Sequence, residues 1–462
     1  MRSAKKNRFG TDLSRVAGSQ FWRRPAMDRR VLFRHAGAAV AGSFFLPGRA
    51  LAALAQGGGS PIGKAKYVIF VNMAGGPSHA DTFDLKEGAW TLPAMEPASY
   101  GEIRWPRGLF PKMAEHMDSI AVVRSMKAWA LVHGIMQTWI QIGRNPLSGL
   151  SKIAPHIGSV VSRELGDPKD TLPAFVSLNA GSGPGQGYLE PRHAPFYVSP
   201  GGGGLGNTTS PFGVTAFDRK YGLLLELDAE VRATQPFGPV VGEMEQFNRT
   251  ARTLMYNSDV DRVFVFDAAE RARYGSTALG NACITARNLI RSRLGARFIQ
   301  ITTGGWDMHA NIYLGGALNP ANASSTGRVF DNAIGTLLAD LKADGSLSET
   351  LVVCMGEFGR TVGPLNNQAG RDHFLTQAAL FAGAGVRGGK AIGKTDATAR
   401  TVIEPGWRHD REIYAEDIEA TIYSALGIDW TKVYYDDPLN RGFSLVPTNQ
   451  GVDFEPVHEL WG

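Results

Sequence analysis

Six short apolar runs constrain the fold of this chain more than any other feature of its sequence. Runs of this kind, without polar alternation, are typical of strands that are buried on both faces of a sheet. They occupy residues 67–71, 120–123, 175–178, 298–301, 351–354 and 378–382. Amphipathic helical patterns lie between them, at residues 133–142, 284–294, 329–341 and 417–426. The alternation predicts an α/β fold with a doubly wound, mainly parallel sheet that is flanked by helices.

The first 55 residues predict an export signal that is separate from this fold. Arg29 and Arg30 form an arginine pair, the apolar stretch 36–46 follows, and small residues at 50–55 offer cleavage sites. The apolar stretch is shorter than the roughly 20 residues that span a bilayer, so the pattern fits a twin-arginine signal. A short buried helix is the alternative. We therefore predict a periplasmic or secreted protein that is carried by the twin-arginine export machinery.

The rest of the chain is long enough for one large α/β domain with long insertions, or for two domains. Residues 180–215 are rich in Gly and Pro and lack periodicity, which predicts a long surface insertion that covers or borders a site. The predicted organisation is an export signal at 1–55 that starts at Met1 or at Met27, a flexible linker at 56–65 and a single domain at 66–450.

Most of the basic character of the chain lies in its amino-terminal segment. Residues 1–49 hold 11 of the 48 Lys and Arg residues but only two of the 43 Asp and Glu residues, which leaves 37 basic and 41 acidic residues. A basic footprint is the minimum signal for a nucleic-acid partner, so we expect no such partner for the mature chain. Cys283 and Cys354 are too few for a disulfide framework. Cys354 lies in an apolar run, where a buried and unreactive thiol is expected.

Acidic and imidazole side chains follow several of the predicted strands, and ligands bind outside the carboxyl ends of strands in sheets of this type. Asp307 and His309 follow one run and stand two positions apart, so both point the same way in an extended segment. Glu357 follows the next run directly. These three residues are candidate metal ligands, and Arg360 is a candidate for gripping an oxyanion with two parallel hydrogen bonds. The alternatives are a capping Asp with a surface His, and an internal ion pair between Glu357 and Arg360.

Two further histidines lie near these strand ends. His373 is a candidate metal ligand in a polar loop, where Asp372 is an additional candidate. His133 begins the helical pattern at 133–142, and the amino terminus of a helix favours a nearby anion. We consider His133 a catalytic candidate, and a satisfied core histidine is the alternative.

A third group of candidates follows the first predicted strand. His79, Asp81 and Asp84 are additional candidates for the site, and the Gly pair before them lets backbone N–H groups approach a ligand. The alternative is a turn followed by a helix cap at Ser78 or at Asp81.

Several segments resemble a known bacterial family. They read VNMAGGPSHADTFD (71–84), GGWDMHAN (304–311), GEFGRT followed by GRDHF (356–374), and IGKTDATAR followed by YAEDIEATIYSALGIDW (392–430). Their order and spacing are similar to those of the family catalogued as domain of unknown function 1501, in which twin-arginine leaders are usual. That family is grouped with the alkaline-phosphatase-like superfamily of phosphatases, sulfatases and phosphomutases. The resemblance implies a central mixed sheet with metal ligands on the loops at its carboxyl edge.

The chain departs from the pattern that this resemblance implies. His133 stands in the place of a Ser, Thr or Cys nucleophile, and the first strand ends in Ala-Gly-Gly where an Asp ligand is implied. Glu357 replaces the Asp of an Asp-His pair, and Asp307 with His309 resembles a contracted ligand pair. His373 matches the last histidine. We therefore expect one divalent ion (zinc, manganese or iron), held by some of these side chains, in place of a full two-zinc site.

Two functions of different classes fit these residues. The first is an exported, metal-dependent hydrolase of phosphate, sulfate or related esters of small molecules or polysaccharides. In this function Arg360 holds the ester, and His133 acts as nucleophile or general base. The second is a non-catalytic periplasmic binding or assembly protein that keeps the fold, because the hydroxyl or thiol nucleophile is absent. A third reading is an isomerase or transferase of the phosphomutase kind, which no residue favours specifically.

Overall fold

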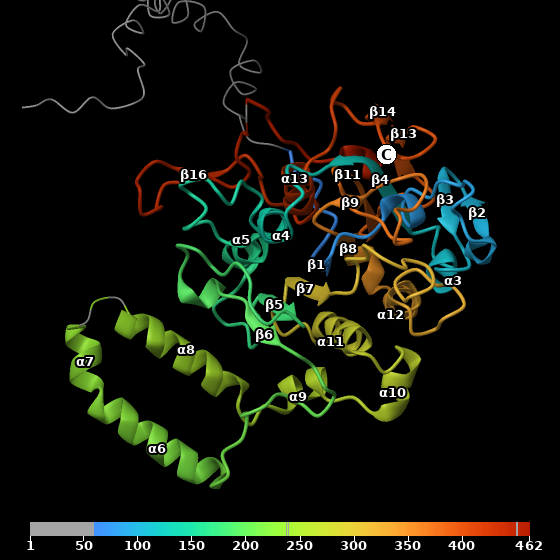
Figure 1. Cartoon of the computed structure of the whole chain (residues 1–462). Helices are drawn as coiled ribbons and strands as arrows, with labels where there is room; N and C mark the ends of the chain where they lie inside the picture. The colour runs from blue at the N-terminus through green and yellow to red at the C-terminus, as the bar shows by residue number, and fades with distance from the viewer. Residues whose placement is uncertain (1–59, 237, 239, 450) are drawn as a thin grey trace, which may run out of the picture. The chain divides into compact units, whose positions relative to one another are not determined.

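The computed structural model describes residues 60–236, 238, 240–449 and 451–462. The predicted export signal and residues 56–59 of the predicted linker lie outside the described residues. The part from Gly59 to Gly462 forms one compact unit (Figure 1).

An eight-stranded sheet forms the centre of this unit. In order across the sheet, the strands are β12 (Ala391–Ile392), β4 (Ile120–Lys127), β11 (Thr376–Gly383), β8 (Thr350–Met355), β1 (Tyr67–Met73), β7 (Phe298–Thr303), β5 (Phe175–Leu178) and β6 (Phe196–Val198). Neighbouring strands are parallel except where β11 pairs with β4 and with β8. The predicted mainly parallel sheet is therefore confirmed, and all six apolar runs are strands in it.

The strand register brings several strand ends to the same edge of the sheet. Met73 of β1 pairs with Thr303 of β7, and Met355, the last residue of β8, pairs with Asn72 of β1. Because β11 is antiparallel, its amino end lies at this edge, where Thr376 pairs with Lys127 of β4. Loops that follow β1, β4, β7 and β8 and the loop that precedes β11 thus start from one edge.

Helices cover both faces of the sheet. The helices on one face are α11 (Ala278–Ser292) and α12 (Thr326–Ala343), and those on the other face are α4 (His133–Ile142), α5 (Ile157–Leu165) and α13 (Ala415–Ala425). Alternate strand residues point to each layer, with Ile69 and Ile301 on the first face and Phe70 and Val353 on the second. Cys354 is buried, as expected, and Cys283 is buried too; both are unpaired, and burial raises the pKa of each thiol.

Capping residues explain where several of these helices begin and where one of them ends. Ser325 caps α12 and Thr277 caps α11 through hydroxyl oxygens that accept backbone N–H bonds. The imidazole of His156 caps α5 by accepting from the N–H of Gly158 at 2.8 Å. Gly143 ends α4 with φ +58°, a conformation that glycine adopts without strain.

The Gly-rich segment at 180–215 contains more structure than its sequence predicts. It includes the 3-10 helix η4 (Pro191–His193) and strand β6, which pairs with β5 at the edge of the sheet. The prediction missed β6 because a strand of three residues without a buried side chain leaves no periodic signal.

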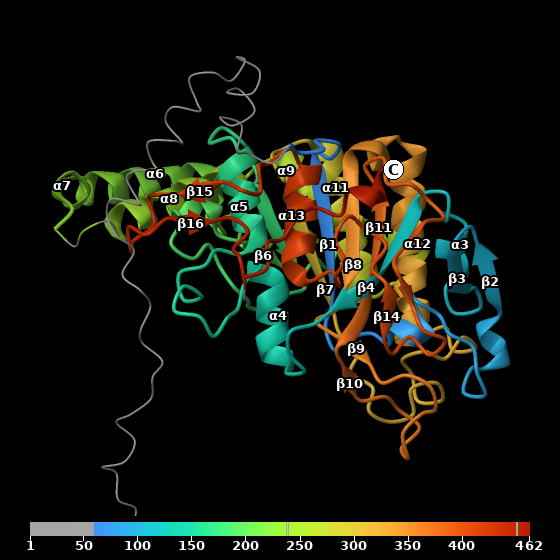
Figure 2. The same cartoon turned by 90° about the horizontal axis from the view of Figure 1, so that it is seen from above.

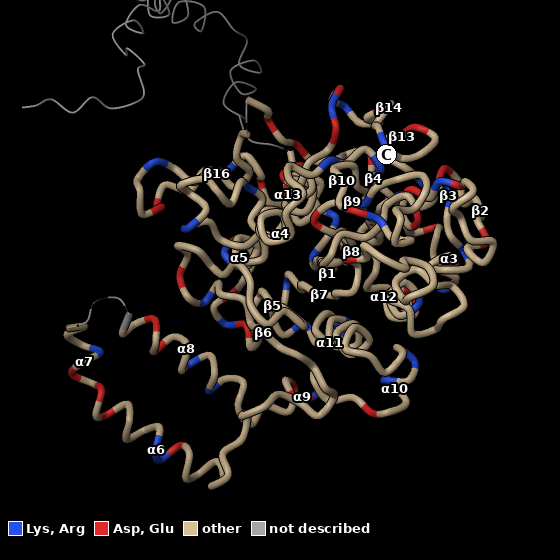
Figure 3. Tube along the Cα trace, viewed as in Figure 1, with Lys and Arg blue, Asp and Glu red and all other residues tan. Residues whose placement is uncertain are grey.

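The sequence patterns did not identify α6 (Gly213–Leu227), which begins within this segment, or the two helices after it, α7 (Ala229–Thr234) and α8 (Val240–Leu254). No residue of α6 or α7 is buried. These helices carry both basic residues (Lys and Arg) and acidic residues (Asp and Glu), as does the rest of the described chain (Figure 3). Within the described ranges, no helix is long and apolar enough to cross a membrane.

Smaller elements complete the described chain. They are η2 (His79–Asp81), η3 (Pro93–Met95), β2 (Pro97–Tyr100), β3 (Ile103–Pro106), α3 (Pro111–Ala114), α9 (Ser258–Phe264), α10 (Ala268–Arg273), η5 (Ser346–Glu349), β9 (Gly359–Arg360), β10 (His373–Phe374), β13 (Lys394–Thr395), β14 (Val402–Glu404), β15 (Val433–Tyr434), β16 (Phe443–Ser444) and η6 (His458–Leu460).

Candidate metal centre

Four of the predicted site residues lie on segments that start from the same edge of the sheet. Asp307 lies on the loop after β7, Glu357 on the turn after β8, and His133 is the first residue of α4, which follows β4. His373 begins β10, just before β11, and the antiparallel direction of β11 brings it to this edge. In Figure 2, α4, β9 and β10 lie toward the same end of the sheet.

His133, Asp307, His309 and His373 form a group that we call the histidine cluster. His133, Asp307 and His373 each offer a ligand atom, and these atoms lie within 4.8 Å of one another. Nε2 of His133 is 3.3 Å from Oδ2 of Asp307, and Nε2 of His373 is 3.6 Å from Oδ1. Nε2 of His309 lies 3.1 Å from the same Oδ1 and 3.1 Å from Nε2 of His373. Imidazole and carboxylate ligands together suit zinc, manganese or iron.

Hydrogen bonds behind the three imidazoles determine which nitrogen of each ring faces the cluster. Each Nδ1 donates to an oxygen outside it: His133 to Oε1 of Glu357 (2.6 Å), His309 to Oδ1 of Asp372 (2.7 Å) and His373 to the carbonyl of Leu131 (2.9 Å). Carbonyl and carboxylate oxygens only accept, so we assign the proton of each neutral ring to Nδ1. Each Nε2 then directs a lone pair toward Asp307.

A cluster of facing acceptors requires a cation or added protons between them. Nε2 of His309 and Nε2 of His373 face each other, and both face a carboxylate. Arg360 supplies one donor, Nη1, at 3.3 Å from Nε2 of His309. Nε2 of His133 is buried, and no residue of the described chain forms a hydrogen bond with it. Neutral imidazoles and an ionised carboxylate are the ligand forms that a divalent ion needs.

Glu357, predicted as a metal ligand, supports His133 from behind. Its side chain is fully buried, and both of its oxygens accept from the N–H of Gly75, at 3.0 and 3.2 Å. Oε1 also accepts from Nε2 of Gln137 at 3.1 Å and from His133. A carboxylate behind a ligating imidazole fixes the tautomer and raises the basicity of the ring.

Arg360, predicted to grip an oxyanion, is fully buried, and its guanidinium already has protein partners. Nε donates to the carbonyl of Gly76 at 2.8 Å and Nη1 to the carbonyl of Arg371 at 3.1 Å. Nη2 donates to Oδ1 of Asp307 at 2.5 Å and also to the carbonyl of Gly75. The alternative ion pair between Glu357 and Arg360 does not occur, because Arg360 pairs with Asp307.

The charges around the cluster shift three pKa values. Partial burial opposes ionisation of Asp307, but the hydrogen bond and the positive charge of Arg360 outweigh it and lower the pKa of this carboxyl. The hydrogen bond from His309 lowers the pKa of Asp372. Burial, with the nearby charge of Arg360, lowers the pKa of His373 and favours its neutral, ligand-competent form.

His79, Asp81 and Asp84, the additional candidates, make other contacts. Nε2 of His79 donates to the carbonyl of Ala399 at 2.9 Å, and burial lowers the pKa of this ring. Asp81 forms a buried ion pair with Arg371 at 2.6 Å. Asp84 lies 3.1 Å from Nζ of Lys86 and accepts from the hydroxyl of Thr395. These contacts hold the loops around the cluster together.

The sequence analysis did not identify two residues of the site. Gln137 donates to Glu357 and stands four positions after His133, the spacing that places both on one face of α4. This spacing was a usable signal. The ring of Phe358 lies 4.8 Å from that of His133 and 4.4 Å from that of His373. A Phe after a strand gives no comparable signal.

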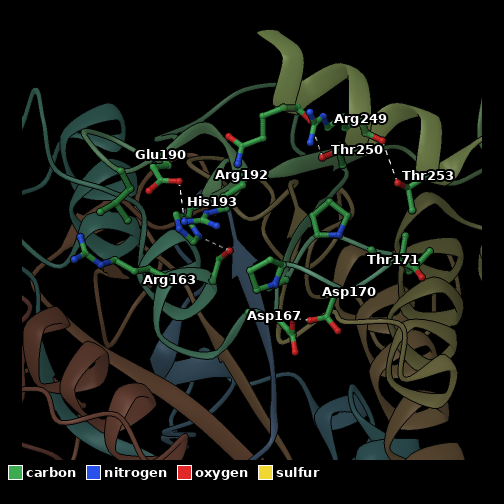
Figure 4. A pocket seen from close by; sticks show the side chains of 18 of the residues that line it. Arg163, Asp167, Asp170, Thr171, Glu190, Arg192, His193, Arg249, Thr250 and Thr253 are labelled. Carbon is green, nitrogen blue, oxygen red and sulfur yellow. Dashed lines mark hydrogen bonds and ion pairs between the residues drawn. The ribbon is translucent and has the colours of Figure 1, made fainter. Parts of the chain in front are cut away.

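A cavity of about 680 Å³ lies at a different place in the fold (Figure 4). Its lining includes the segment just before β5, so it is near the amino end of that strand, whereas the cluster is at the carboxyl edge. Two of its arginines have acidic partners: Arg163 contacts Asp436 at 3.0 Å, and Arg192 contacts Glu190 at 2.8 Å.

Comparisons with known proteins identify a family but no activity. Residues 65–453 match the family described as a protein of unknown function, DUF1501. No curated protein gives a significant match. A PsFucS1 sulfatase structure from Pseudoalteromonas sp. aligns with 11% identity and a TM-score of 0.39, over 79% of this chain and 68% of that chain.

Two further solved structures are similar at the same level. An alkaline phosphatase superfamily protein from Vibrio parahaemolyticus has 12% identity and a TM-score of 0.36, over 80% of this chain and 69% of that chain. The phosphonate monoester hydrolase SpPMH from Silicibacter pomeroyi has 10% identity and a TM-score of 0.36, over 86% and 76%. This level of similarity carries no conclusion about activity.

Proposed function

We propose that this chain is an exported, metal-dependent hydrolase of phosphate, sulfate or related esters. The chain belongs to the DUF1501 family, whose function is unknown. The proposal rests on the geometry of its candidate site. One observation carries the proposal. The histidine cluster directs three imidazole lone pairs and one carboxylate inward, while every Nδ1 is bound to an outer acceptor.

The roles of the residues follow from their positions. His133, Asp307 and His373 would hold the ion, and Glu357 fixes the ring of His133. When bound, a divalent ion of this kind opposes the negative charge that develops on an ester oxygen and lowers the pKa of water. His309 would accept a proton from water at Nε2, because Asp372 keeps its Nδ1 protonated.

An anionic substrate fits the surroundings of the cluster. His133 is the first residue of α4, and the first N–H groups of a helix lack partners within the helix. These groups favour a phosphate or sulfate oxygen. Arg360 serves this site by holding Asp307 and the loop after β1, since its donors are already engaged.

Metal content and turnover test this proposal together. Chain isolated after export should contain about one zinc, manganese or iron ion, and His373→Ala and Asp307→Asn should lose it. The matched control His409→Ala, at a histidine that contacts Glu455, should keep it. The metal-loaded chain should hydrolyse at least one member of a panel of aryl phosphates, aryl sulfates and aryl phosphonates. Full metal content in both site variants would refute the assignment.

The second candidate function is a non-catalytic periplasmic binding or assembly protein. Two observations favour it: α4 begins with His133, which offers no hydroxyl or thiol nucleophile, and the donors of Arg360 are occupied by the protein. A chain that binds metal but hydrolyses no ester of the panel would support this function over the first.

A further inference from the structure

We propose that Glu357 and Gln137 are positioning residues for His133, and that a buried glutamine ladder holds α4 in place against β7 for the same purpose. The ladder consists of the buried side chains of Gln300 and Gln141 and the backbone carbonyl of the half-buried Gln137, and His156 anchors it. The inference rests on the proposed function, because it concerns how the same site keeps one imidazole in its ligand form.

The direction of every hydrogen bond in the ladder follows from one backbone group. The N–H of Gly158 donates to Nδ1 of His156 at 2.8 Å, so the ring proton is on Nε2. Nε2 then donates to Oε1 of Gln300 at 2.7 Å. Nε2 of Gln300 in turn donates to Oε1 of Gln141 at 3.1 Å, and Nε2 of Gln141 donates to the carbonyl of Gln137 at 2.6 Å. Burial lowers the pKa of His156 to about 3, so the ring stays neutral.

The ladder connects two of the elements that position ligands of the cluster. Gln300 lies in β7, whose end leads to Asp307, and Gln141 lies in α4, which begins with His133. A hydrogen bond between these glutamines therefore limits sliding of the helix along the strand. The distance between His133 and Asp307 depends on that position.

Glu357 sets the ring of His133 at the other end of α4. Its Oε1 accepts from His133 and from Gln137, one helical turn apart, and from the N–H of Gly75. Three donors converge on this one oxygen. Because an ionised carboxylate only accepts hydrogen bonds, the ring of His133 must carry its proton on Nδ1 to bond with it. The second donor from α4 keeps the carboxylate turned toward the helix.

Stability alone does not explain this arrangement. Replacing both members of a buried hydrogen-bonded pair by apolar groups of the same shape is often close to neutral for folding. Polar networks instead specify one geometry. A positioning role predicts that metal affinity changes more than stability does.

The test uses Zn²⁺ alone as the probe, with the metal-free exported chain. We expect Glu357→Gln to weaken Zn²⁺ binding about 10-fold and Glu357→Leu about 100-fold, the range for residues that orient a ligand. Gln137→Met should weaken it by about 10-fold, the lower end of that range. Thr138→Val is the matched control, because the hydroxyl of Thr138 bonds only within α4, and it should bind as the parent does.

Nitrogen-15 NMR of histidine-labelled, metal-free chain gives a readout that a merely structural role would not change. His133 should be an Nδ1–H tautomer in the parent and in Glu357→Gln, whose amide oxygen still accepts, and a tautomer mixture in Glu357→Leu. Unchanged Zn²⁺ affinity and tautomer in both Glu357 variants would overturn the proposal. If the parent binds no Zn²⁺ but Glu357→Leu still alters the tautomer, the proposed function fails and the positioning role stands.

Discussion

Replacing Gly75 by Ala should both destabilise the chain and disturb the cluster. Gly75 follows β1 with φ +115°, and a Cβ there would lie 2.5 Å from the backbone nitrogen of Asp307 and 2.9 Å from the carbonyl carbon of Trp306. Both contacts are with backbone, which cannot rotate away. We expect the free energy of unfolding to fall by about 1–3 kcal/mol because of the backbone conformation and by a similar amount because of overpacking, which gives roughly 2–6 kcal/mol in total.

Urea unfolding, followed by tryptophan fluorescence, measures this loss. Gly134→Ala is the matched control, since nothing lies within 4 Å of a Cβ at that helical position, and it should gain about 0.4–1 kcal/mol. Gly75→Ala should also weaken Zn²⁺ binding by at least about 10-fold, because it displaces Asp307. An unfolding midpoint equal to that of the parent would refute the close approach of the loops after β1 and β7.

Three further outcomes follow from the structure and the sequence. Asp81→Asn should lower the free energy of unfolding in urea by roughly 3–5 kcal/mol, because it leaves the buried guanidinium of Arg371 without its charge partner. A loss below about 1 kcal/mol would contradict the burial of this ion pair. Burial lowers the pKa of His193 from 6.5 to about 4. His193 of the unfolded chain therefore binds a proton below about pH 6.5, whereas His193 of the folded chain binds one only below about pH 4. The urea midpoint of the parent should therefore decrease between pH 6.5 and about pH 4, and it should decrease less in His193→Asn. The same decrease in the parent and in the variant would refute this prediction. Replacing both Arg29 and Arg30 by Lys should keep the chain in the cytoplasm in cell fractionation, and normal export would contradict the twin-arginine assignment.

The apolar runs predicted the sheet well, because a strand that is buried on both faces needs apolar side chains at successive positions. They could not predict the direction of β11, since an apolar run reads alike in parallel and antiparallel strands. That direction places His373 at the carboxyl edge of the neighbouring strands. β6 escaped prediction for a different reason, because none of its three residues is buried and it pairs only at the sheet edge.

The candidate residues were found because carboxylates and imidazoles after strands are visible in a sequence. Their partners were not, because those contacts join distant segments. Sequence alone cannot show that Asp81 meets Arg371, or that Glu357 receives the N–H of Gly75. The absence of an Asp after β1 also has a steric reason, since Gly75 has no room for a side chain beside Asp307.

The charges of the site favour one divalent ion over two. Asp307, Glu357 and Asp372 contribute three negative charges, Arg360 contributes one positive charge, and the three imidazoles are neutral in the assigned tautomers. The formal sum is minus two, which one divalent ion balances and two ions would exceed, and unbalanced charge in a partly buried site is costly. Elemental analysis should therefore give one ion per chain at saturation. Two tightly held ions would show that the site carries more negative charge than minus two.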